Sequence, residues 1–451
     1  MRVSPVHAPP ESERRAAHVG GAAAPFAQRL DPGSRRRLLS LLFGMNLINY
    51  VDRVNVTIVA PVILADLGWD KAKLGSVMSV TLLGYAAGQI PAGLLIDHFG
   101  GVVILAAMCA AWSIATALTP PLFGWMAALL AVRFLLGFFE SVNNPGQTSL
   151  NTRAFPPSEL ARAQGLCFAG TQVGPLIASP LIAWLVTLYP WSYVFYGCAA
   201  LGLVWVVAWL ALVPRLPAPG DGASPGGLAS GRASASRATP PPVPLAILAA
   251  PPVLALALAG LLWGYAMWLF VAWFPTYLSD AWGLSMQSMG WVNAIPTLGG
   301  IAALIGGGWI SDRLVQRGVA EGRARKLLAV AGLGGSSLCM VAAALAPNGV
   351  AAVAFFTLNG FVQGIAVAPL FSLPAVLAPR AAATIAAAAN FCMALGGVVS
   401  PYVAGLLRDR TGEWSVAFLT AAAALLLASV VLGLAFRAEP LPGHGRHGEA
   451  V

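Results

Sequence analysis

Twelve long stretches of mostly apolar residues dominate the sequence and restrict the folds that it can adopt. A hydrocarbon core of ~30 Å is crossed by a helix of ~20 apolar residues, and every stretch is long enough for one crossing. They lie near residues 38–62, 74–97, 101–119, 122–150, 161–188, 191–213, 249–278, 286–311, 327–346, 350–376, 382–407 and 415–436. The composition agrees, because 58% of the residues are hydrophobic and only 10% are charged. We therefore predict an all-α membrane protein with twelve transmembrane helices.

A stretch rich in Pro, Gly, Ser and Ala separates the sixth apolar segment from the seventh. Such a composition without periodicity is typical of a flexible linker, which we place at residues 214–248. It divides the chain into one six-helix bundle at 38–213 and a second at 249–437. Polar tails at 1–37 and 438–451 flank the two bundles.

The two halves repeat each other. The sequence from Ser179 to Phe195 begins with Ser-Pro and ends with Trp-Ser-x-x-Phe, and so does the sequence from Ser400 to Phe418. Two six-helix pseudo-repeats in parallel orientation predict a central site at their interface and alternating access by rocking of one half against the other.

The distribution of Lys and Arg predicts the orientation in the membrane. With a cytoplasmic N-terminus, the inner segments carry 20 of the 26 basic residues and the outer loops carry 4. Basic residues accumulate on the cytoplasmic side, so both termini are expected there. The formal net charge of +9 is explained by this bias, and no nucleic-acid partner is expected. Arg far outnumbers Lys, and Ala, Gly and Pro are abundant. This composition is typical of a GC-rich bacterial genome, so we expect a protein of the bacterial inner membrane.

Four ionisable residues lie inside apolar segments of the first half: Asp52, Arg53, Arg133 and Glu140. Charges in hydrocarbon are costly and mark transport pathways by default. The planar guanidinium groups of the two arginines suit a substrate carboxylate. Two acids and two bases together predict transport of an anion with protons. The alternative is that the four residues form fixed ion pairs that join two helices. Neighbours in a helix differ by ~100° in direction, so Asp52 and Arg53 are expected to point to different places.

Several uncharged side chains could complete a substrate site. Tyr50, Tyr85, Gln172 and Asn390 could bind substrate hydroxyl groups, although such residues also join helices within membranes. Trp273 could cover the site, although an aromatic residue near a helix end is equally expected at the membrane interface.

The sequence lacks the features of an enzyme. It has no nucleotide-binding loop, no nucleophile with a partner base, and no cluster of metal ligands. We therefore expect no catalytic residues, no cofactor and no metal, and an ion gradient is the expected energy source. All five histidines lie outside the apolar interiors, so the protonatable sites are expected to be carboxylates.

The loops after the second and eighth segments resemble the glycine-aspartate-arginine signature of the major facilitator superfamily. The second copy matches at Gly308, Asp312, Arg313 and Arg317, whereas the first keeps Asp97 but has His98 where Arg is usual. The resemblance implies that Asp97, Asp312 and Arg313 control the gate during rocking.

Within that superfamily, the chain most resembles the anion:cation symporter family. The matching motifs are Asn49-Tyr50-Val51-Asp52-Arg53-Val54-Asn55, Gly84-Tyr85, Gln89-Ile90-Pro91-Ala92-Gly93, Arg133-Phe134 with Gly137 and Glu140, Trp273-Phe274-Pro275-Thr276-Tyr277-Leu278, and Asn390-Phe391. The resemblance implies a monomeric symporter that takes up an organic carboxylate, such as a sugar acid or an aromatic acid, with Asp52 and Glu140 binding protons.

A proton-coupled antiporter that exports a drug or metabolite is the alternative. Gly170, Gly174 and Pro175 partly match the glycine-proline motif of such exporters, but the closing glycine pair is absent. The Asp-Arg and Arg-Glu pairs favour symport.

Overall fold

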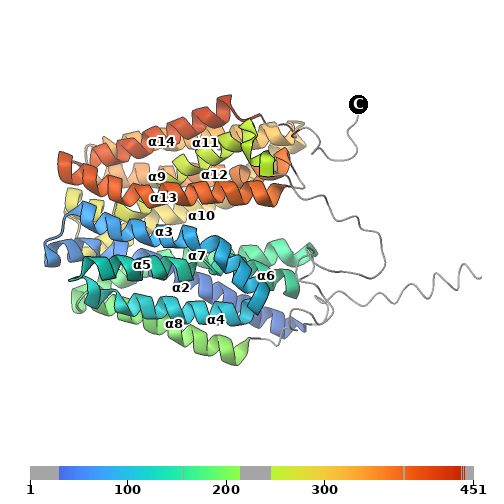
Figure 1. Ribbon diagram of the computed structural model, residues 1–451. Helices are drawn as coiled ribbons and strands as arrows, with labels where there is room; N and C mark the ends of the chain where they lie inside the picture. The colour runs from blue at the N-terminus through green and yellow to red at the C-terminus, as the bar shows by residue number, and fades with distance from the viewer. Residues whose placement is uncertain are drawn as a thin grey trace, which may run out of the picture.

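A computed structural model describes residues 30–155, 157–213, 245–378 and 381–437, together with residues 439 and 441. Almost all of these residues belong to helices that lie side by side (Figure 1). The α-helices are α2 (Pro32–Leu67), α3 (Lys71–Phe99), α4 (Gly101–Leu118), α5 (Met126–Glu140), α6 (Asn143–Ala154), α7 (Pro157–Leu188), α8 (Ser192–Leu212), α9 (Pro251–Trp282), α10 (Met286–Gln316), α11 (Glu321–Ala344), α12 (Gly349–Leu377), α13 (Ala382–Thr411) and α14 (Trp414–Leu434). Two short 3-10 helices, η2 (Pro120–Leu122) and η3 (Leu245–Ala249), lie between them.

The predicted all-α fold with twelve crossings is confirmed. Within the described residues, eleven crossings are long and apolar enough to span a membrane, with α5 and α6 together forming one of them. The twelfth is α10, which packs against α12 and α7.

One predicted crossing, residues 122–150, contains a break at Ser141 and Val142 that separates α5 from α6. Pro145 explains the break, because proline has no N–H to donate to the Ser141 carbonyl and its ring crowds that oxygen. Glu140 is therefore the last residue of α5.

The helices extend beyond the apolar stretches from which they were predicted. At the start of α2, Asp31 accepts a hydrogen bond of 3.2 Å from the backbone N–H of Ser34, and Pro32 occupies the first helical position. Both features favour a helix start, so α2 begins inside the expected N-terminal tail at 1–37. Residues 1–29, 214–244 and 442–451, which include most of the expected tails and linker, lie outside the described residues.

The helices form two bundles that meet along a central interface. The N-terminal bundle comprises α2 to α8 and the C-terminal bundle comprises α9 to α14 (Figure 1). Across the interface, α3 packs against α13, α7 against α10, and α2 against α9. We call the end of the molecule where α2 ends and α3 begins the distal end, and the other end the proximal end.

Glycines allow α3 and α5 to approach closely next to the centre of the N-terminal bundle. A Cβ atom added to Gly84 on α3 would lie 1.9 Å from the carbonyl oxygen of Phe134, and one added to Gly137 on α5 would lie 1.9 Å from that of Thr81. Real side chains cannot occupy such positions, so glycine is required at this contact. The contact holds Arg133 and Glu140 of α5 directly against α3.

Candidate functional site

The four charged residues predicted from the sequence come together around one cavity. Asp52 and Arg53 project from α2, and Arg133 and Glu140 from α5. The cavity has an empty volume of about 500 Å³, which includes space open to solvent. Asp52, Arg133 and Glu140 are only 1–2% exposed. At this degree of burial, a charge without a partner is energetically costly.

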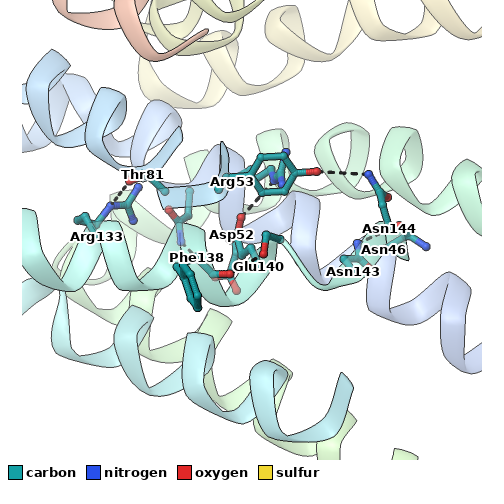
Figure 2. Close-up of polar contacts among 12 residues, drawn as sticks. Asn46, Asp52, Arg53, Thr81, Arg133, Phe138, Glu140, Asn143 and Asn144 are labelled. Carbon is teal, nitrogen blue, oxygen red and sulfur yellow. Dashed lines mark hydrogen bonds and ion pairs between the residues drawn. The ribbon is translucent and has the colours of Figure 1, made fainter. Parts of the chain in front are cut away.

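Arg53 and Glu140 form an ion pair between α2 and α5. The Nε atom of Arg53 lies 3.2 Å from Oε2 of Glu140, while Oε1 of Glu140 is buried without a hydrogen-bond partner among the described residues (Figure 2). The pair thus leaves part of the carboxylate unused.

Aromatic rings surround the Arg53 guanidinium. Its central carbon lies 4.2 Å from the ring centroid of Tyr85, 5.2 Å from that of Tyr50 and 5.8 Å from that of Trp268. A guanidinium within ~6 Å of a ring centroid is attracted to the ring. Trp268 belongs to α9, so this arginine links the two bundles.

Arg133 has a different partner and retains unused donors. Its Nε donates a hydrogen bond of 3.0 Å to the hydroxyl of Thr81 on α3 (Figure 2). Its buried Nη1 has no hydrogen-bond partner among the described residues. A buried guanidinium with a free donor beside a cavity can receive the carboxylate of a ligand.

Asp52 takes no part in the ion pair formed by its neighbour Arg53. One carboxylate oxygen accepts a hydrogen bond of 3.3 Å from Asn55 on the same helix, and the other is buried without a partner in the described part of the chain. The acid therefore lies beside the two arginines without a direct ion pair to either in the structure.

The predicted uncharged residues are divided among several places. Tyr85 lines the charged cavity, and Tyr50 stacks against Arg53. Asn390 instead lines a second, largely apolar cavity between α9, α12 and α13. Gln172 is half-buried on α7 and does not line the charged cavity.

Trp273 is fully buried within the C-terminal bundle. Its indole N–H donates a hydrogen bond of 2.8 Å to the carbonyl oxygen of Pro401, and its ring lies 5.4 Å from that of Trp414. In this structure its contacts are therefore with α13 and α14, and it is absent from the lining of the charged cavity.

The proximal gate residues are only partly described. Asp97 and Asp312 lie in α3 and α10, but their side chains lie outside the described part of the structure. Arg313 is exposed on α10. The predicted gating role of these three residues therefore stays a prediction.

An ion-pair cluster at the distal end joins the bundles and was not identified from the sequence. Asp280 on α9 lies 3.4 Å from Nζ of Lys71 on α3 and 3.0 Å from Nη2 of Arg408 on α13. Beside the cluster, the backbone N–H of Ala72 donates a hydrogen bond of 2.7 Å to Asp409. These polar contacts therefore join the two bundles at the distal end of the interface.

Two further residues at the cavity were missed by sequence reasoning, namely Thr81 and Trp268. Neither is charged, and each lies in an apolar segment in which threonine and tryptophan are common. Only the contact with an arginine on another helix identifies them, and such a contact is not encoded in local spacing.

Comparisons with known proteins agree with this architecture. The family model described as "Major Facilitator Superfamily" matches residues 42–401. A protein of Cupriavidus necator described as "Probable sulfoacetate transporter" is 28% identical, over 87% of this chain and 91% of that protein. The D-galactonate transporter of Escherichia coli O6:H1 is 29% identical, over 84% of this chain and 91% of that protein. Among solved structures, a bacterial homologue of the human lysosomal transporter Spinster superposes with a TM-score of 0.71 at 18% identity, covering 90% of this chain and 96% of that one.

Proposed function

The chain belongs to the Major Facilitator Superfamily, and we propose that it takes up an organic carboxylate together with protons by alternating access. It is a multi-pass membrane transporter and not an enzyme. The names of the relatives, which refer to sulfoacetate and D-galactonate, support an organic anion as the substrate. The substrate and the coupling ion are our inference.

One observation carries the proposal. Arg53 is paired with Glu140 at 3.2 Å, whereas the nearby Arg133 keeps a buried donor without a partner, and both arginines line the same cavity. An anion entering the cavity could bind Arg133 at once. It could bind Arg53 fully only by replacing Glu140.

This competition provides a mechanism for coupling. Protonation neutralises Glu140, weakens its ion pair with Arg53 and releases that guanidinium for the substrate carboxylate. Asp52, buried without an ion-pair partner in the structure, is the second proposed proton site. With both acids neutral, the two arginines carry a charge of +2, which favours a carboxylate and more than one proton for each monoanion.

We place both termini on the cytoplasmic side of a bacterial inner membrane, following the bias of Lys and Arg in the sequence. The proximal end then faces the cytoplasm. In this orientation the contacts of Lys71 and Arg408 with Asp280 close the outer side of the pathway. We propose that a monomer is sufficient for transport, with the bundles at 38–213 and 249–437 as its two moving units.

The glycine motif that suggested an exporter has a packing explanation. A Cβ atom added to Gly170 would lie 2.5 Å from the carbonyl oxygen of Phe43, and one added to Gly174 would lie 2.6 Å from that of Leu47. These glycines allow α7 to pack closely against α2, so they do not favour export over uptake.

The direction of proton movement tests the proposal. Purified protein would be reconstituted into vesicles that contain a pH-sensitive dye, and a panel of carboxylates would be added outside without a pH gradient. Symport predicts that a transported carboxylate acidifies the vesicle interior and that Glu140→Gln abolishes the signal. The matched control is Glu413→Gln, an exposed acid at the start of α14. Alkalinisation of the interior by the substrate would establish antiport instead.

A further inference from the structure

The charged cavity offers few uncharged hydrogen-bonding groups to a ligand. Apart from its four ionisable residues, the described lining has three hydroxyl groups, on Thr57, Thr81 and Tyr85. Most of the remaining wall is apolar, with aliphatic side chains such as Leu82 and Val271. The part of a ligand beyond its carboxylate therefore meets a mainly apolar surface.

The three hydroxyl groups are already engaged. Thr57 donates to the carbonyl oxygen of Val54 at 2.9 Å, and Thr81 donates to that of Val77 at 3.0 Å while accepting from Arg133. Tyr85 accepts a hydrogen bond of 3.3 Å from Asn144. Both threonine protons are thus used, and the tyrosine proton remains as a hydroxyl donor for a ligand.

Two aromatic side chains line the cavity beside Arg53. Tyr85 and Trp268 both line the cavity and both lie within 5.8 Å of the Arg53 guanidinium carbon. A carboxylate on the arginines would bring its attached group next to these rings. Aromatic rings pack well against such faces.

A second cavity also lies against α9, and its described lining is more apolar than that of the charged cavity. It lies beside α9 and is lined by apolar side chains that include Trp263, Phe371 and Met393, with Asn390 as its one amide in the described lining. Thus, apart from the four ionisable residues, the described linings of the two cavities hold few uncharged partners for a polyhydroxylated ligand.

We propose that the substrate is a monocarboxylate with an aromatic ring and few hydroxyl groups, not a polyhydroxylated sugar acid. A hydroxyl that leaves water without finding a partner weakens binding by about tenfold, and a sugar acid carries several. An aromatic body instead gains from leaving water. This inference rests on the proposed function, because it assumes that the carboxylate binds Arg53 and Arg133.

Calorimetry on the purified full-length protein tests the substrate class with benzoate, gluconate and benzamide as probes. We expect benzoate to bind at least about tenfold more tightly than gluconate. Benzamide, which lacks the charge, and the Arg133→Ala variant with benzoate should show no measurable binding. Gluconate binding as tight as that of benzoate, and lost in Arg133→Ala, would overturn the inference and leave the proposed function intact. If neither benzoate nor gluconate shows binding that depends on Arg133, both the inferred substrate class and the proposed function are overturned.

A substitution in the cavity wall that hardly changes its volume tests where the aromatic ring of the ligand lies. Val271→Thr adds a hydroxyl to the cavity wall at almost unchanged volume. Even with its proton donated to the helix backbone, as in Thr57 and Thr81, its oxygen can accept a hydrogen bond from a gluconate hydroxyl, so the variant should lower the ratio of benzoate affinity to gluconate affinity by about threefold or more. The control is Val207→Thr at a residue 68% exposed on α8, which should leave the ratio unchanged. An unchanged ratio in Val271→Thr would contradict the proposed position of the ring.

Discussion

The Nε atom of Arg53 on α2 lies 3.2 Å from Oε2 of Glu140 on α5, and the Glu140 side chain is only 2% exposed. Removing one member of a buried ion pair leaves the other charge without compensation. A substrate carboxylate can therefore separate this pair only if it compensates Arg53 and a proton compensates Glu140. This relationship makes the pair suitable for coupling anion and proton movement.

Thr81 should act as a positioning residue for Arg133. Thr81→Val removes the 3.0 Å hydrogen bond to Arg133 Nε, which costs about 1 kcal/mol, so the affinity for a transported carboxylate should fall about fivefold. Thr81→Ser keeps the hydroxyl and should restore most of the affinity. Equal affinities of the wild type and Thr81→Val in calorimetry would contradict this role.

Trp268 should support binding from the opposite bundle. Replacing it by leucine removes the aromatic face 5.8 Å from the Arg53 guanidinium, which is worth ~0.5–2 kcal/mol. Substrate affinity should therefore fall severalfold in Trp268→Leu and much less in Trp268→Phe. Affinities that fall equally in both variants would show that the loss of indole packing, and not the aromatic face, is responsible.

The distal ion-pair cluster should control exposure to the outer side. Asp280→Asn weakens the contacts with Lys71 and Arg408, and partly exposed pairs contribute ~0.2–1 kcal/mol each, so the distally open population should rise severalfold. The readout is labelling of Thr57→Cys by an impermeant thiol reagent added outside, in a background without the native cysteines.

The control for the distal cluster is Asp66→Asn. Asp66 also lies near the distal end, but it accepts a hydrogen bond of 2.9 Å from Trp191 within the same bundle. Asp66→Asn should therefore not change the labelling rate of Thr57→Cys. Equal labelling rates with and without Asp280→Asn would show that these ion pairs do not hold the distal end closed.

Gly137 should be required for the packing of α3 on α5. Gly137→Ala places a methyl group 1.9 Å from the Thr81 carbonyl oxygen, and overpacking of this kind costs ~1–3 kcal/mol. The thermal denaturation temperature of the purified protein should fall. Gly93→Ala on α3, where an added Cβ meets nothing within 4 Å, should leave it nearly unchanged, and equal behaviour of the two variants would contradict the packing account.

The sequence predicted the crossings well because hydropathy responds directly to the membrane. The ends were less accurate, since α2 starts at Asp31 and Pro32 in polar sequence that carries no hydropathy signal. The charged residues of the cavity were also predictable, because a charge inside an apolar segment is rare enough to be informative.

Contacts between helices were not predictable from local patterns. Asp280 lies at the end of an apolar segment, where a solvated acid is ordinary, and its partners Lys71 and Arg408 are distant in the sequence. The motif predicts that Asn390 binds the substrate, and this stays a prediction, because the structure places it on a different cavity from the four charges. Only the packing of α9, α12 and α13 determines which cavity a residue on α13 reaches.

Proton coupling by Glu140 and Asp52 can be measured separately from binding of the anion. The most direct measurement compares uptake driven by an imposed pH gradient with exchange of substrate across the same vesicles, for the wild type, Asp52→Asn and Glu140→Gln. We expect both variants to lose uphill uptake but to retain measurable exchange, because the arginines still bind the carboxylate. Uphill uptake at the wild-type level in both variants would contradict it.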